Sequence, residues 1–173
     1  MTNRCIMLFP KFTNMDIIDR IREQYDPAAR LVPPHITLVF PFESDISTAA
    51  LSAHITGALA AASPFEVVLS NIAPAPDRYL FLHVQKGTAE ISAMHEKLYA
   101  GLLRPFYPDW LQSLTFLPHM TVGRFEDDAE WESAANKLKG VTDQFQAVID
   151  TVYVEIINLE NDESIIELSI PLK

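Results

Sequence analysis

The chain has 173 residues, of which 49% are hydrophobic and 21% are charged, and its formal net charge at pH 7 is −10. This length and composition can bury a sizeable core, which excludes global disorder and limits the chain to one domain or two closely fused half-domains. The 13 Lys and Arg face 23 Asp and Glu without any basic run, which argues against an extended nucleic-acid-binding surface, because such a surface must neutralise many phosphates.

Cysteine content and the absence of targeting signals narrow the expected setting. Cys5 is the single cysteine, so neither an internal disulfide framework nor a cysteine-based zinc site is expected. No apolar run approaches the length of a membrane span, and residues 1–11 lack the shape of a signal peptide. We therefore expect a cytoplasmic protein. We also expect a monomer, and the net charge still permits a small phosphate ligand in a local pocket.

The first half of the chain alternates strands and helices. Apolar residues at near-helical spacing predict a helix after the first strand, and an Ala- and Leu-rich stretch predicts a second helix. Pro33-Pro34 ends the connection that follows the first helix and leads into a strand. The expected elements are a strand over Cys5–Phe9, a helix over Asn14–Tyr25, a strand over His35–Phe40, a helix over Ser47–Ala62 and a strand over Phe65–Ile72.

The second half repeats this alternation and ends in a hairpin. The stretch Tyr79–Val84 is apolar on both faces, which predicts a central strand. The aromatic segment Arg104–Leu117 predicts an irregular connection, either a packed loop or a lid over a site. Asn161-Asp162 predicts the turn of the final hairpin. The other expected elements are helices over Thr88–Leu103 and Asp128–Lys139 and strands over His119–Phe125, Phe145–Ile149, Val152–Asn158 and Ile165–Ile170.

The order of elements suggests an internal repeat. Strand, helix, strand, helix and strand follow one another over about residues 4–73, and the same order recurs over about residues 78–158. Two such halves related by a pseudo-two-fold axis predict a bilobal α+β fold, with two antiparallel-rich sheets around a central cleft and helices outside. We expect residues 1–173 to form this single bilobal domain, in which strands are exchanged between the lobes.

A pentapeptide occurs twice, as Pro-His-Ile-Thr-Leu at 34–38 and as Pro-His-Met-Thr-Val at 118–122. Random placement of 5 His and 10 Thr gives about 0.3 copies of a bare His-x-Thr triplet, and on the order of 0.01 copies with these flanking residues. A third triplet, His54-Ile55-Thr56, lies in a predicted helix, where residues two apart point about 200° apart. We therefore predict that His54 is a helix-surface residue.

Each copy of the pentapeptide combines an imidazole with a hydroxyl. Side chains alternate between the faces of a strand, so His35 shares a face with Thr37, and His119 shares a face with Thr121. One imidazole can deprotonate an attacking water while the other protonates a leaving oxygen. The two hydroxyls can bind the non-bridging oxygens of a phosphoester. If the copies meet across one cleft, they predict hydrolysis of a phosphodiester without a metal or another cofactor.

The doubled His-x-Thr-x motif, its spacing and the chain length resemble the 2H phosphoesterase superfamily, which includes 2′-5′ RNA ligase-like proteins and 2′,3′-cyclic phosphodiesterases. The resemblance implies a bilobal α+β fold with the two motifs facing each other in a central cleft. It implies that His35 and His119 are the acid and base, and that Thr37 and Thr121 hold the phosphate. It further implies a cyclic phosphate or a 2′-5′ linkage of a nucleotide or short RNA end as the substrate.

Other candidates accompany the motifs. Arg124 could bind the phosphate, although strict alternation places it opposite His119 unless Gly123 permits a bulge. Tyr79 and Phe81 could stack on a base, but core packing is the simpler interpretation. His83 shares their face and is interpreted as structural. We interpret His95, beside a glutamate on its helix, as a solvated side chain.

Two further functions compete with the phosphoesterase hypothesis. The first is a non-catalytic binder of a cyclic phosphate or nucleotide, which would use the same cleft and the same four motif residues. Turnover of a cyclic nucleotide would separate it from an enzyme. The second is a histidine-ligated metalloenzyme. Two histidines without acids at ligand spacing fall short of the three or four ligands of a zinc site, so no metal site is expected.

Overall fold

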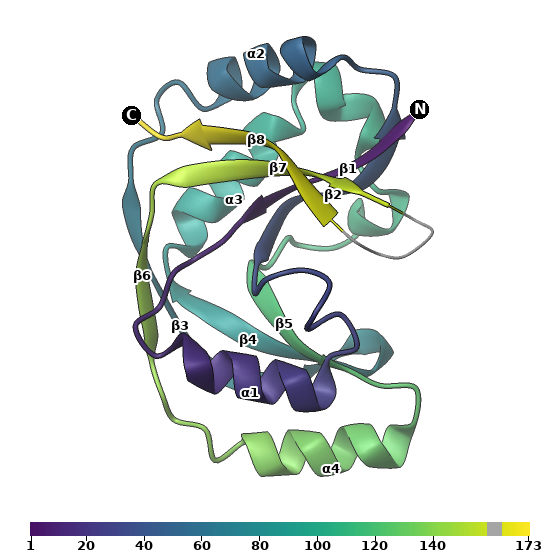
Figure 1. The fold of residues 1–173 in the computed structure, drawn as a ribbon, viewed down its shortest axis with the longest axis vertical. Helices are drawn as coiled ribbons and strands as arrows, with labels where there is room; N and C mark the ends of the chain where they lie inside the picture. Colours follow the sequence, from purple (N-terminus) through teal and green to yellow (C-terminus); the bar gives the residue numbers. More distant parts are fainter. Residues whose placement is uncertain (159–163) are drawn as a thin grey trace.

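The computed structural model describes residues 1–158 and 164–173, which form an α+β fold, as expected (Figure 1). The elements, with η marking a 3-10 helix, are β1 (Thr2–Leu8), α1 (Met15–Tyr25), β2 (Ile36–Ser44), α2 (Thr48–Ala58), β3 (Phe65–Ala75), η1 (Pro76–Arg78), β4 (Tyr79–Lys86), α3 (Thr88–Leu98), η2 (Gly101–Phe106), η3 (Asp109–Leu111), β5 (His119–Arg124), α4 (Asp128–Leu138), β6 (Phe145–Ile149), β7 (Thr151–Ile157) and β8 (Ser164–Pro171).

The strands form one curled sheet in the order β6-β3-β4-β5-β2-β1-β7-β8, and the neighbouring strands pair antiparallel. Strands β2, β1, β7 and β8 make up the terminal lobe, and β5, β4, β3 and β6 make up the central lobe. Figure 1 shows the terminal lobe above the central lobe. The lobes join where β2 meets β5, and the register there pairs Ile36 with Met120. The expected bilobal fold is therefore confirmed, with the two antiparallel halves continuous at this one contact.

Helices and strands cross between the lobes. Helix α1 follows β1 in the chain but packs on β5 of the central lobe, and α3 follows β4 but packs on β2 of the terminal lobe. Figure 1 shows α1 beside β5. Strand β3 pairs with β4 and β6. Strand β3 thus belongs to the central lobe, although most of it falls in the first predicted half. The division into half-repeats over 4–73 and 78–158 stays a prediction.

In the central strand β4, buried and half-buried side chains alternate along the chain. In β4, Leu80 and Leu82 are fully buried, while Tyr79, Phe81 and His83 are only half-buried. The strand lies between β3 and β5, so its predicted central position is confirmed. Only one of its faces lies in the core, however, because Tyr79, Phe81 and His83 lie on the other face, where they pair with β5.

Several boundaries differ from those expected, and each has a local cause. Strand β3 continues through Pro74 to Ala75, because β6 pairs only with residues 65–69, so that the missing N–H of Pro74 costs no ladder hydrogen bond there. The helix expected over Thr88–Leu103 ends at Leu98 and gives way to η2, where Gly101 has a φ of 59°. The predicted pairing of the last two strands is confirmed, but its Asn161-Asp162 turn lies outside the described residues.

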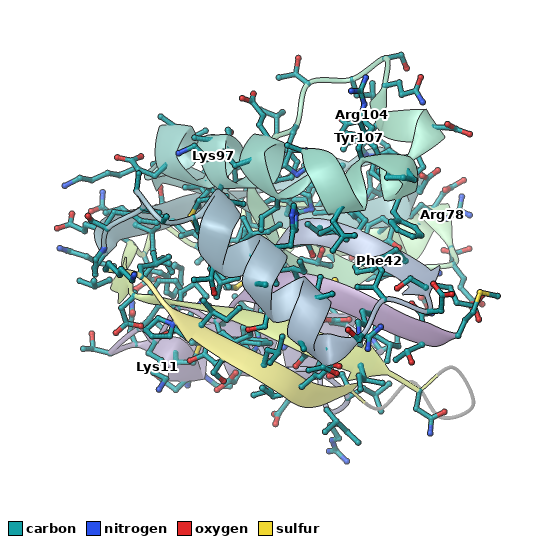
Figure 2. The ribbon with its side chains drawn as sticks, turned by 90° about the horizontal axis from the view of Figure 1, so that it is seen from above. Lys11, Phe42, Arg78, Lys97, Arg104 and Tyr107 are labelled. Carbon is teal, nitrogen blue, oxygen red and sulfur yellow. The ribbon has the colours of Figure 1, made fainter. Side chains whose placement is uncertain are left out.

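The loop between α3 and β5 begins with η2 and η3 and lies at one end of the molecule. Figure 2 shows Arg104 and Tyr107 of this segment together, on the side opposite Lys11. Phe106 packs on Phe42 of β2 with ring centroids 5.2 Å apart, so the segment is held against the terminal lobe. Within the described residues, no helix is long and apolar enough to span a membrane.

Gly87, which links β4 to α3, provides a test of this fold. It has a φ of 93°, and a Cβ there would approach Val67 Cγ1 to 2.8 Å and the Glu66 carbonyl to 3.0 Å. Gly87→Ala should therefore lower the free energy of unfolding by about 1–3 kcal/mol, measured by urea denaturation. Gly57→Ala is the control, because a Cβ at this position in α2 meets nothing within 4 Å and should stabilise by about 0.5 kcal/mol. Equal effects at both positions would contradict the close packing at Gly87.

Candidate active site

The four polar motif side chains lie on one face of the sheet, where β2 and β5 meet. Continuing the Ile36–Met120 register by one residue in each direction sets His35 across from Thr121 and Thr37 across from His119. All four are half-buried, whereas the apolar residues between and beyond them are buried. The two copies of the pentapeptide therefore contribute to one site.

Both motif imidazoles are held in the same way. His35 Nδ1 lies 2.9 Å from the Pro33 carbonyl oxygen, and His119 Nδ1 lies 2.8 Å from the Leu117 carbonyl oxygen. A carbonyl oxygen can only accept, so the proton of each neutral ring is on Nδ1, and Nε2 carries the lone pair. Each ring can thus take a proton at Nε2, and once protonated it can donate one from the same atom.

Burial sets the charge state of the two rings. It lowers the pKa of His35, while the hydrogen bond to Pro33 opposes this shift. It also lowers the pKa of His119, where repulsion from His83 and His35 adds to the effect and the Leu117 carbonyl opposes it. Both imidazoles are therefore predominantly neutral at pH 7 in the free protein.

A buried ion pair fixes the loop that leads to His35. Arg22 Nε donates to Asp26 Oδ2 at 2.8 Å, and Arg22 Nη2 donates to the Val32 carbonyl at 3.0 Å. Asp26 Oδ1 accepts from the Ala28 amide at 3.0 Å. The guanidinium thus ties residues 26–32 to the end of α1. Because Pro33 follows directly, the same pair steadies the carbonyl that orients His35.

Aromatic rings frame the two imidazoles. Phe81 stacks on His119 with ring centroids 3.6 Å apart and an interplanar angle of 17°, and Phe9 approaches His35 edge-on at 6.2 Å. The interpretation of Phe81 as a core residue was wrong, since the ring is half-buried on the motif face. His83 is paired with His119 across β4 and β5. The alternation of residues in β4 placed Phe81 and His83 on the same face, but only the pairing of β4 with β5 shows that this face borders the site.

Arg124 lies on the motif face because of a bulge. Phe81 pairs with Thr121 and Leu80 with Gly123, so Val122 is an extra residue in β5. Arg124 consequently pairs with Tyr79, and its guanidinium carbon lies 5.6 Å from the centre of the Tyr79 ring. The bulge considered at Gly123 is therefore present. A phosphate-binding role for Arg124 stays a prediction.

Two histidines outside the motifs are less exposed than expected. His54 lies on α2, as predicted, but it is half-buried and its Nε2 is 2.9 Å from the Leu98 carbonyl oxygen. The expectation that His95 is solvated was wrong, because its side chain is 2% exposed. Helix α3 packs on β2, and His95 belongs to the buried stripe that includes Ile91 and Leu98. The i, i+4, i+7 spacing of this stripe was the available signal.

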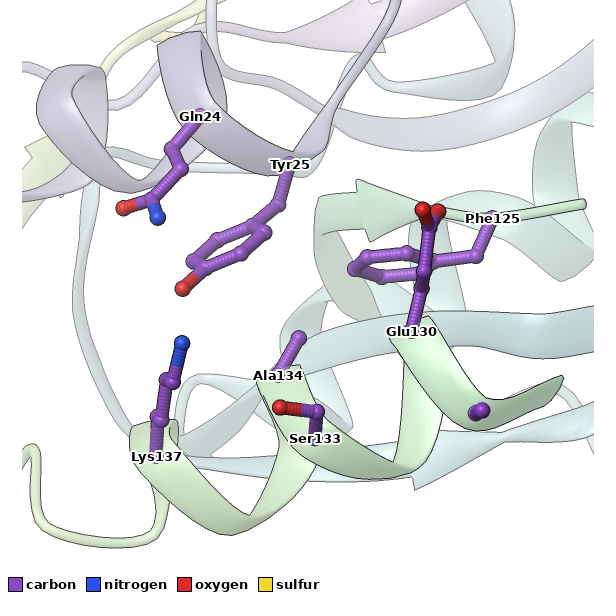
Figure 3. A pocket seen from close by; sticks show the side chains of 8 residues that line it. Gln24, Tyr25, Phe125, Glu130, Ser133, Ala134 and Lys137 are labelled. Carbon is purple, nitrogen blue, oxygen red and sulfur yellow. The ribbon is translucent and has the colours of Figure 1, made fainter. Parts of the chain in front are cut away.

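Two cavities lie near α1. One of about 490 Å³ lies between α1 and α4 and contains no motif residue; Figure 3 shows Tyr25 and Lys137 facing each other across it. The other, of about 630 Å³, is lined by Phe9, Pro34 and Tyr153, among others; Pro34 precedes His35, but none of the four motif His and Thr side chains lines the cavity. Among residues 1–158 and 164–173, no three His, Cys, Asp or Glu side chains form a group that could hold a metal ion.

The lowered pKa of His119 makes stability depend on pH. The pKa of this group is near 6.5 in the unfolded chain, so around this pH the unfolded chain binds more protons than the folded chain. The contribution of His119 to the free energy of unfolding is therefore complete above pH 6.5 and is lost as pH falls toward the folded-state pKa. His119→Gln should therefore flatten the dependence of the unfolding free energy on pH between about 7.5 and 5.5. Burial raises the pKa of Glu155, which acts in the opposite direction, so the difference between parent and variant is measured. Identical slopes would contradict the shift at His119.

Comparison with known proteins places this geometry in a family. The 2′-5′ RNA ligase superfamily model matches residues 10–161. A Bacillus licheniformis protein provisionally named a phosphoesterase is 30% identical over 153 residues, covering 86% of each chain. A Bacillus cereus protein with the same provisional name is 29% identical, covering 90% of this chain and 88% of the relative.

Solved structures share the fold at lower identity. LigT of E. coli complexed with 3′-AMP has a TM-score of 0.61 at 14% identity, covering 99% of this chain and 95% of LigT. A Thermus thermophilus protein has a TM-score of 0.61 at 15% identity, covering 98% of this chain and 97% of its own. The family model matches most of the chain, and the chain belongs to the 2′-5′ RNA ligase superfamily of 2H phosphoesterases.

Proposed function

We propose that the protein is a metal-independent phosphoesterase that hydrolyses a cyclic phosphate or a 2′-5′ phosphodiester of a nucleotide or RNA end. The observation that carries the proposal is the pair of imidazoles on one face, each with Nδ1 bound to a carbonyl and Nε2 left for proton transfer. Membership in a phosphoesterase superfamily supports the reaction type.

In the proposed reaction, two histidines divide the proton transfers. One neutral imidazole takes a proton from water at Nε2 as the water oxygen attacks phosphorus. The other, protonated imidazole gives its Nε2 proton to the oxygen whose bond to phosphorus breaks. Thr37 and Thr121 donate hydrogen bonds to the non-bridging oxygens, where charge accumulates. Arg124 adds positive charge beside them. The protons balance because one moves from water onto the first ring and one moves from the second ring onto the leaving oxygen, and exchange with solvent then restores both rings.

A small substrate agrees best with the charge and the cavities. The net charge of −10 disfavours a long duplex, and the cavity of about 630 Å³ lined by Phe9 and Pro34 is large enough for a nucleoside. LigT, which shares the fold, has been crystallised with 3′-AMP, ATP and NADP+. These observations support a nucleotide or a short RNA end as the partner.

A non-catalytic binder of the same ligands is the alternative, because binding needs the same four side chains. Incubation with a panel of 2′,3′-cyclic nucleotides, followed by identification of the products, separates the two functions. Formation of a 2′- or 3′-monophosphate that persists in excess chelator supports the enzyme. Binding without turnover across the whole panel would favour the binder.

Substitution of the motif histidines tests the division of roles. His35→Ala and His119→Ala should each lower kcat for a cyclic nucleotide by roughly 10²-fold or more, since each removes one proton transfer. The double variant should lose less than the product of the two losses, because the residues act as a unit. His54→Ala is the control: it removes a histidine from the same triplet on a helix, and kcat should be unchanged. Loss of activity in that control, but not in His119→Ala, would contradict the proposal.

The pH dependence of the rate follows from the two lowered pKa values. The active form has one neutral and one protonated imidazole, and its population is greatest between the two pKa values of the free protein. Because burial lowers both pKa values below 6.5, the profile of kcat/KM should be bell-shaped with its maximum on the acid side of pH 6.5. Initial rates at low substrate concentration between pH 4.5 and 9 measure it. A rate that keeps rising into the alkaline range would contradict acid–base catalysis by two histidines.

A further inference from the structure

The first motif strand continues past the point where its partner leaves it. Strand β2 runs to Ser44, but within the described residues β5 pairs with it only at Ile36. Beyond that point two side chains bind the β2 backbone, one from α3 and one from Tyr99, the residue that directly follows α3. His95 Nδ1 lies 2.7 Å from the Leu38 carbonyl oxygen, and the Phe40 amide donates to the Tyr99 hydroxyl at 3.0 Å. Side chains thus take the place of a neighbouring strand.

His95 also touches the approach to the second motif. Its ring stacks on Phe116 with centroids 3.8 Å apart and an interplanar angle of 3°, and the Tyr99 ring meets it edge-on at 5.0 Å. Phe116 immediately precedes Leu117, whose carbonyl oxygen holds His119. The same imidazole therefore contacts the last residue of the first pentapeptide and the segment that leads into the second.

Packing alone does not account for a histidine at this position. His95 is 2% exposed, and its Nε2 has no hydrogen-bond partner in the part of the chain that the structure describes. A buried acceptor without a partner is unfavourable, and a phenylalanine would stack on Phe116 without that cost. What the imidazole supplies beyond a phenyl ring is the Nδ1–H that Leu38 accepts.

We propose that His95 is a positioning residue for the reaction, and that Tyr99 assists it. Together they hold the backbone of β2 at Leu38 and Phe40, so that Thr37 and His35 keep their register against the second motif. This inference rests on the proposed function for its effect on rate. Its effect on the hydrogen exchange of the β2 backbone does not depend on that function.

Three substitutions at position 95 separate the hydrogen bond from the ring. Asparagine places an amide nitrogen where Nδ1 lies and keeps the donor, leucine has a similar shape without a donor, and phenylalanine keeps the ring without a donor. His95→Leu and His95→Phe should lower kcat for a cyclic nucleotide roughly 10-fold with KM within about two-fold, because a misplaced group impairs the transition state more than binding. His95→Asn should retain kcat within about three-fold of the parent. Amide hydrogen exchange of residues 38–40 should accelerate in the leucine and phenylalanine variants and stay near the parental rate in the asparagine variant.

His54→Leu is the matched control, since it removes an imidazole-to-carbonyl hydrogen bond to Leu98, which lies outside both motif strands. It should change neither kcat nor the exchange of residues 38–40. The proposal is overturned if folded His95→Leu and His95→Phe keep parental kcat, or if His95→Asn loses as much as His95→Leu.

Two further measurements keep the proposal testable in every case. If the position 95 variants do not fold, Tyr99→Phe removes a single hydroxyl, and it should lower kcat a few-fold and accelerate exchange of the Phe40 amide. Parental values of both would overturn the proposal. If the parent itself turns over no cyclic phosphate, the proposed function fails, and exchange at residues 38–40 alone decides the positioning role. Unchanged exchange in all position 95 variants would then overturn it.

Discussion

The antiparallel contact between Ile36 and Met120 is the constraint on which the rest of the site depends. Strand alternation around this contact sends two imidazoles and two hydroxyls to one face and buries the apolar residues on the other. A slip of one residue would move polar groups into the core and apolar groups toward water. The hydrophobic effect therefore sets the register, and the register assembles the polar site.

Much of this arrangement could be predicted from the sequence, because it depends on local periodicity. The doubled pentapeptide predicted that His35 and His119 each share a strand face with a threonine, and the spacing of apolar residues predicted most helices and strands. What lies around the imidazoles could not be predicted in the same way. Phe81 stacks on His119 only because β4 pairs with β5, and a strand pattern does not name its neighbours.

His95 and Arg124 illustrate two other limits of prediction. His95 is buried because α3 crosses to the terminal lobe, so its environment depends on a long-range exchange of helices. Arg124 reaches the motif face through one extra residue, Val122, which reverses the alternation beyond it. Gly123 allows such a bulge, but packing decides it: a Cβ there would approach Phe125 to 3.1 Å. A single glycine in a strand signals that possibility and leaves its outcome open.

The exchanged helices also govern how the molecule can move. The chain passes between the lobes repeatedly, since α1 leaves β1 to pack on β5 and α3 leaves β4 to pack on β2. Two bodies joined by one linker can swing about it as a hinge, but bodies that clasp each other through exchanged helices cannot separate without undocking them. The exchanged helices therefore hold β2 and β5, which carry the four motif side chains, in one fixed arrangement. On heating, the clasped lobes should melt together in one cooperative transition.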